Sequence, residues 1–123
     1  MLSRAAKIYR NVSIDSASPT RTLDETYSRL IAECRTAADR IAQRDLAGKG
    51  MAISRCLGLV GALAAALDHK AAPELCANLG RLYQFIRDKL VEANFKVNAK
   101  PLDDVTRIVT SLRETFQLAA DNP

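Results

Sequence analysis

The sequence has few of the residues from which most catalytic and metal sites are built. Its 123 residues include one His, three Cys and no Trp, and aromatic residues make up only 5% of the chain. It contains no Glu-x-x-His pair with which a helical bundle holds two metal ions, and no Gly-rich phosphate loop that follows a strand-like segment. We therefore expect no enzymatic activity, no cofactor and no metal site.

The cysteines and the single histidine give little support to a disulfide framework or a zinc site. Cys34, Cys56 and Cys76 are an odd number and lack close-paired spacing, which disfavours a set of structural disulfides. Each falls in the apolar stripe of a different expected helix, so buried, inert thiols are favoured over metal ligands. His69 lies in an expected connection between helices, where we expect a solvated side chain.

Neither sign of charge is concentrated in one part of the chain. The 18 basic and 14 acidic residues give a net charge of +4, and residues 1–50 contribute +3 (nine basic, six acidic). Residues 51–123 contribute the remaining +1 (nine basic, eight acidic). Because no basic block stands out and few aromatic residues accompany the cations, we expect no nucleic-acid partner.

No segment has the pattern of an export signal or a membrane span. The first seven residues lack an apolar stretch of the kind found in signal peptides. The longest apolar run covers the twelve residues 56–67, whereas a bilayer requires roughly 20. The expectation is a cytoplasmic protein without membrane insertion.

What the chain does have is apolar residues, 48% of the total with 20 Ala and 15 Leu, at helical spacing. The first helix is expected to begin near Leu23 and to stop at the two glycines of residues 47–50. The second spans residues 51–68, the third runs from Pro73 to about Asn94, and the fourth covers residues 101–116. Short connections place sequential helices antiparallel. The sequence thus predicts an all-α protein, an antiparallel up-down four-helix bundle.

The bundle is expected over residues 21–118, between an N-terminal arm of residues 1–20 and a C-terminal tail of residues 119–123. Ser and Pro punctuate the arm, yet Ile8, Tyr9, Val12 and Ile14 give it apolar anchors. Two interpretations stay open, a frayed tail and a mobile arm that packs against the bundle.

The second helix is apolar around its whole circumference, although a bundle helix needs only one apolar stripe. Gly58 and Gly61 lie within one turn of it, and Gly80 repeats the feature in the third helix. Glycine inside a helix costs about 1 kcal/mol relative to Ala. Either neighbouring helices of the bundle pack tightly there, or an apolar groove accepts another helix, from the arm or from a partner chain.

The third helix carries a motif that points to a family. Residues 78–94, NLGRLYQFIRDKLVEAN, resemble the pattern Asn-Leu-x-x-Leu-Tyr-x-x-Ile/Met-x-x-x-Leu-x-x-Ala-Asn of the flagellin-specific export chaperones, the FliS family. Leu67-Asp68 is similar to the end of the preceding helix in that family, and residues 102–116 are similar to its last helix. Tyr9, Ser18-Pro19 and Tyr27 stand about where the family has Tyr, Ser-Pro and Leu-Tyr-Asp-Gly.

Three departures from the pattern indicate a divergent member. Ser28-Arg29 follow Tyr27 in place of Asp-Gly, and Thr26 precedes it in place of Leu. Residues 69–73 replace a glycine-rich turn, and Phe116 replaces a more common Trp.

The resemblance implies a cytoplasmic bundle that holds the disordered C-terminal segment of flagellin, prevents its premature polymerisation and delivers it to the flagellar export machinery. We expect helix-in-groove capture, with Ile8 and Tyr9 of the arm covering the groove when no client is bound. An alternative is a dimeric structural or signalling adaptor that uses the same apolar face for a homodimer. The expected partner-binding residues are Leu57, Gly58, Gly61, Ala65, Asn78, Leu79, Leu82 and Tyr83.

Overall fold

A computed structural model describes residues 7–9 and 19–121 of the chain. Four helices make up the fold: α2 (Pro19–Ala42), α3 (Leu46–Ala65), α4 (Pro73–Lys96) and α5 (Lys100–Asp121). No strand occurs among these described residues. The predicted all-α four-helix bundle is confirmed, whereas most of the predicted arm, including Ser18, lies outside the described residues.

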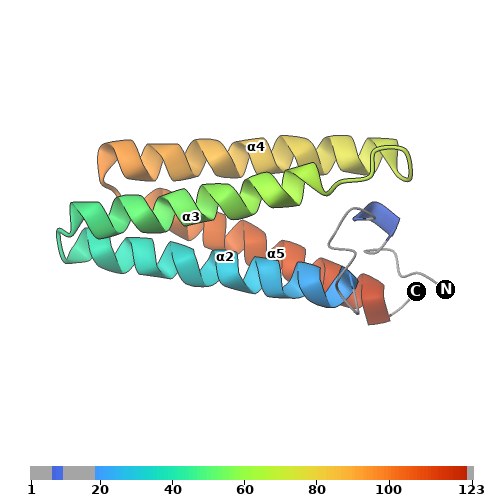
Figure 1. Cartoon of the computed structure of the whole chain (residues 1–123), viewed down its shortest axis with the longest axis horizontal. Helices are drawn as coiled ribbons and strands as arrows, with labels where there is room; N and C mark the ends of the chain where they lie inside the picture. The colour runs from blue at the N-terminus through green and yellow to red at the C-terminus, as the bar shows by residue number, and fades with distance from the viewer. Residues whose placement is uncertain (1–6, 10–18, 122–123) are drawn as a thin grey trace.

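The helices form a closed ring in chain order. α3 packs against α2 and α4, and α5 packs against the same two helices from the other side (Figure 1). Short connections make each helix antiparallel to the next one in the chain. The α2–α3 contact is the most extensive and the α4–α5 contact is the least extensive of the four.

The core is aliphatic, with an aromatic cluster at one end. All four helices contribute fully buried apolar side chains, among them Leu30, Ile53, Ile86, Leu90 and Val105. Tyr9, Tyr27 and Tyr83 are the largest side chains that are fully buried. Fully burying one aliphatic side chain gains about 1.5–3 kcal/mol, so this shared core explains why the four stripes predicted from the sequence come together.

The boundary between the first two helices differs from the prediction. α2 ends at Ala42, a full turn before the glycines, and Arg44 takes a left-handed conformation with φ of 59°. Asp45 is the N-cap of α3, and its Oδ1 accepts the backbone N–H of Gly48 at 2.9 Å. The predicted stop at residues 47–50 is wrong because a side-chain cap begins a new helix there. A Cβ at Gly48 would collide with the Asp45 carboxylate, so this glycine gives the cap its space.

The same end of the bundle is tied together by a buried lysine. Lys49 is 8% exposed, and its Nζ donates to the backbone carbonyl of Asn94 at 3.0 Å. This bond joins the first turn of α3 to the last turn of α4, where the exposed carbonyls of a helix end favour a cation. α4 then ends at Val97, which is left-handed with φ of 51° and donates its N–H to Ala93.

Among the helices of the described residues, α3 is the one with the length and composition of a membrane span. Its 20 residues include an 18-residue window of mean hydropathy 1.3. The expectation that no segment qualifies was too strict, because it considered only the uninterrupted run of residues 56–67. In this fold one face of α3 packs against α2 and α4, and 33% of the window is buried.

The Asp45 cap is expected to contribute measurably to stability. Asp45→Ala leaves the N–H of Gly48 without its acceptor and should lower the free energy of unfolding by about 1 kcal/mol in urea denaturation. Asp45→Asn keeps a capping oxygen and should remain within about 0.5 kcal/mol of the parent. Equal losses in the two variants would attribute the effect to the charge of Asp45, which lies 3.7 Å from Arg40, and not to the cap.

Candidate functional site

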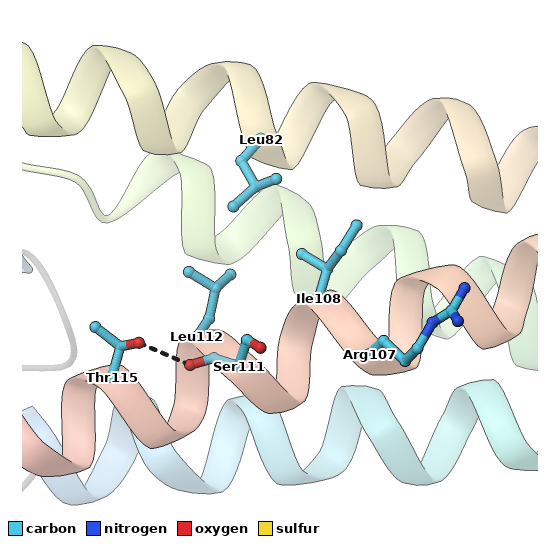
Figure 2. A pocket seen from close by; sticks show the side chains of 6 residues that line it. All are labelled: Leu82, Arg107, Ile108, Ser111, Leu112 and Thr115. Atoms are coloured by element: carbon cyan, nitrogen blue, oxygen red, sulfur yellow. Dashed lines mark hydrogen bonds between the residues drawn. The ribbon is translucent and has the colours of Figure 1, made fainter.

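An open groove of about 320 Å³ runs between α4 and α5. Leu82 of α4 points toward α5, and Ile108 and Leu112 of α5 point toward α4, so the floor is apolar (Figure 2). Arg107, Ser111, and Thr115 line the rest of the groove and are exposed. An apolar floor with a polar edge is typical of a surface that binds another chain.

The groove exists because the apolar stripe of α5 is wider than the core needs. Val105, Val109 and Phe116 are buried against the other helices. Ile108 and Leu112 lie one turn apart beside that line and pack against the core with only part of their surface. Since α4 and α5 have the least extensive contact in the bundle, this partly covered row remains accessible.

The N-terminal segment places Tyr9 in a pocket at the aromatic end of the core. Tyr9 is completely buried, and its ring meets Phe116 edge-on, with centroids 5.6 Å apart. Phe116 follows Leu112 by one helical turn, and Tyr83 follows Leu82 directly in sequence. Tyr9 thus packs against a residue that lies one helical turn beyond Leu112 on α5.

Three buried hydroxyls hold Tyr9 in this pocket. The Tyr9 hydroxyl lies 3.2 Å from that of Tyr27 and is also hydrogen-bonded to that of Tyr83. The hydroxyls of Tyr27 and Tyr83 are 2.6 Å apart, which completes a triangle called here the tyrosine cluster. Burial raises the pKa of Tyr27 and Tyr83 far above the usual value, so both remain protonated donors. In the next residue toward the N-terminus, the carbonyl of Ile8 accepts the N–H of Asp68 at 2.8 Å.

A charged pair fixes the wall of this pocket. Arg113 of α5 binds Asp24 of α2 through two hydrogen bonds, of 2.8 and 3.2 Å, and Gln117 donates a third at 2.8 Å. The Arg113 guanidinium lowers the pKa of Asp24, although partial burial acts in the opposite direction. The pair joins α2 to α5 beside Tyr27 and Phe116, which stack with centroids 6.1 Å apart.

The eight residues expected to bind a partner fall into two groups. Gly58, Ala65 and Asn78 are exposed, and Leu57, Gly61 and Leu82 are partly exposed, although Leu82 points toward α5 (Figure 2). A Cβ at Gly61 would approach the Arg87 guanidinium to 4.0 Å, so Gly61 faces α4. Leu79 and Tyr83 are buried, Leu79 in the core and Tyr83 in the tyrosine cluster.

Ile108 and Leu112 were not among the expected site residues, although both lie within the predicted fourth helix of residues 101–116. The sequence signal that could have found them is the width of the apolar face of that helix. Ile108 and Leu112 lie beside the row formed by Val105 and Val109, so the apolar face is wider than one row. Only Leu82 belongs both to the expected surface and to the groove between α4 and α5.

The glycines of α3 and α4 do not mark tight packing within the bundle. A Cβ at Gly58 or Gly80 would meet no atom within 4 Å. Of the two explanations for these residues, close approach of neighbouring helices is therefore wrong at both positions. The space above them is open.

The described residues offer no alternative site for metal chemistry. Among residues 7–9 and 19–121, no group of three His, Cys, Asp or Glu side chains is placed to hold an ion. His69 is exposed in the connection between α3 and α4, and the three cysteines are buried and free.

Comparison with known proteins agrees with this architecture. The family model described as "Flagellar protein FliS" matches residues 1–123. The chain belongs to the FliS family. It is 30% identical to the flagellar secretion chaperone FliSB of Pseudomonas aeruginosa, over 89% of this chain and 90% of that protein. Identity to the flagellar secretion chaperones FliS of Salmonella typhimurium and Vibrio cholerae is 26% and 25%, over 90% and 88% of this chain and 86% and 82% of theirs.

Membership confirms the resemblance drawn from the motif in α4. Its FliS relatives are named as chaperones and not as enzymes, in agreement with the scarcity of catalytic residues in this chain. Sequence identities of 25–30% fit a divergent FliS member.

The open space at the two glycines leads to a stability prediction. Gly58→Ala and Gly80→Ala should each raise the free energy of unfolding by up to about 1 kcal/mol, because Ala favours the helix and its methyl group meets no neighbour. Gly48→Ala is the matched control in which the methyl group displaces the Asp45 cap, so it should gain less. Urea denaturation that ranks all three variants equally would contradict this account.

Proposed function

We propose that this chain is a cytoplasmic export chaperone that captures the disordered C-terminal segment of flagellin and delivers it to the flagellar export machinery. The observation that carries the proposal is the open apolar groove of Leu82, Ile108 and Leu112 on a bundle of the FliS family. A disordered segment with a helical apolar stripe matches such a groove, as in other helix-in-groove complexes.

The client segment is proposed to lie along α5 and to continue over the α3–α4 surface. Ile108 and Leu112 supply apolar contact area, and the exposed hydroxyls of Ser111 and Thr115 meet polar groups of the segment. Gly58 and Gly61 allow a close approach of its backbone on the other side of α4. Burial gains about 25 cal/mol per Å² of apolar area, and ordering the segment offsets much of that gain. The complex is therefore releasable at the export gate.

The N-terminal segment is proposed to compete with the client. Tyr9 packs against Phe116, one turn beyond Leu112 on α5, so a client that extends past Leu112 and contacts Phe116 has to displace it. Displacement exposes Tyr83, which would explain how a buried residue takes part in partner binding. Apparent client affinity is then reduced by the fraction of molecules whose pocket is filled.

The groove is tested by titration calorimetry with the C-terminal segment of the flagellin from the same organism. Leu112→Ser should weaken binding about tenfold, because it removes apolar contact and leaves a polar group in the floor. Phe95→Ser is the control: Phe95 is 87% exposed, near the far end of α4, and its loss should leave affinity unchanged. Circular dichroism confirms that both variants remain folded.

The identity of the flagellin partner and the position of the groove are tested by different outcomes. Absence of binding by the parent chain at high micromolar concentration would contradict the flagellin partner itself. Binding by the parent with equal affinity in Leu112→Ser would place the groove elsewhere. A stable dimer in sedimentation that the flagellin segment does not dissociate would favour the adaptor alternative.

Removal of the competing segment should strengthen client binding. Deletion of residues 1–11 is expected to raise client affinity severalfold, because the pocket no longer has to be emptied. Tyr9→Phe keeps the ring and loses only the hydroxyl bonds to Tyr27 and Tyr83, so it should give a smaller increase. Unchanged affinity in the deletion would show that the arm does not compete.

A further inference from the structure

Two of the three cysteines face each other across the most extensive contact of the bundle. The Sγ atoms of Cys34 in α2 and Cys56 in α3 are 3.8 Å apart. Both side chains are buried, with 1% and 0% of their surface exposed. The thiols are 22 positions apart in the sequence, so only the pairing of α2 with α3 brings them together.

The Sγ atoms of Cys34 and Cys56 are already close to bonding distance. A disulfide has a sulfur–sulfur bond of about 2.05 Å, so the two sulfurs have to approach by less than about 2 Å in total. Two side chains share that movement through rotation about their Cα–Cβ bonds. Cys76 is different: its thiol donates to the carbonyl of Asp68 at 3.3 Å, and the sequence has no fourth cysteine to pair with it.

The two thiols are also chemically unequal. The hydrogen bond from the Cys56 thiol lowers the pKa of Cys34, whereas burial opposes its ionisation. The same bond and burial raise the pKa of Cys56. The shared hydrogen bond between the two thiols therefore favours ionisation of Cys34 over that of Cys56.

We propose that Cys34 and Cys56 form a reversible disulfide, driven by a hydroperoxide such as hydrogen peroxide, that locks α2 to α3. The Cys34 thiolate attacks one peroxide oxygen, the O–O bond breaks, and the leaving hydroxide takes up the proton lost by Cys34. The Cys56 sulfur then attacks Cys34 sulfenic acid, the S–S bond forms, and the S–O bond breaks as water leaves with the proton of Cys56. Two thiols and one peroxide thus give one disulfide and two waters.

Burial determines how fast the reaction occurs. Both sulfurs lie inside the α2–α3 contact, so the oxidant reaches them only during local opening of this contact. Hydrogen peroxide is small enough to enter through a limited opening. Once formed, the bond closes a loop containing the end of α2, the turn at Arg44 and the first half of α3, and thereby restricts the unfolded chain.

The full chain is tested with millimolar hydrogen peroxide, followed by denaturation, alkylation and intact-mass analysis. The expected product is a monomer that has lost two hydrogen atoms, with one alkylatable thiol in place of three, restored to three by dithiothreitol. Peptide mapping should join Cys34 to Cys56. The oxidised form should melt about 10 °C higher than the reduced form.

Matched variants identify the pair. Cys76→Ser should still form the disulfide, whereas Cys34→Ser and Cys56→Ala should not lose two hydrogen atoms within one chain. If substitution of either core cysteine prevents folding, the mass loss and peptide map of Cys76→Ser still decide the matter. Three remaining thiols after the peroxide treatment, over-oxidation to sulfinic acid without a disulfide, or a disulfide-linked dimer would each overturn the proposal.

Discussion

The arrangement of the bundle around its candidate site depends on three phenol hydroxyls that have to satisfy one another. A buried hydroxyl without a partner costs about 1–3 kcal/mol, and Tyr9, Tyr27 and Tyr83 avoid this cost only as a set. They come from the N-terminal segment, α2 and α4, while Phe116 of α5 packs against two of the rings. The N-terminal segment, α2, α4 and α5 therefore all contribute a side chain to this one cluster.

This shared pocket connects the architecture with the proposed capture of flagellin. The groove is open along Ile108 and Leu112, and one turn further along α5 Phe116 is buried against Tyr9 and Tyr27. Tyr9, a side chain of the same polypeptide, thus covers this aromatic end of the bundle. A client that binds along α5 and displaces Tyr9 replaces the contacts of Tyr9 with Phe116 by its own contacts. The net free energy of binding is therefore moderate.

The sequence was sufficient to predict the four helices, their antiparallel order and the family, because helical periodicity and the motif in α4 are local signals. It misplaced the boundary between α2 and α3, where Asp45 and the left-handed Arg44 outweighed two glycines. It could not show that Ile108 is partly exposed while Val105 is buried. A periodic pattern gives the direction of the apolar face of a helix but not the distance to the neighbouring helix. For the same reason, Tyr83 was expected at a surface, and its burial by Tyr9 depends on a contact 74 positions away.

The bond between Lys49 and Asn94 has a mechanical consequence. It clamps α3 to α4 at the end of the bundle away from Tyr9, beside the capped start of α3. The two ends of the α3–α4 pair are thus joined in different ways: residues 66–72 connect the helices covalently at the aromatic end, and the Lys49 hydrogen bond links them at the other end. The lysine therefore supplies, at the end of the pair that has no connecting loop, the tie that the chain itself supplies at the other end, and α3 and α4 are held together at both ends.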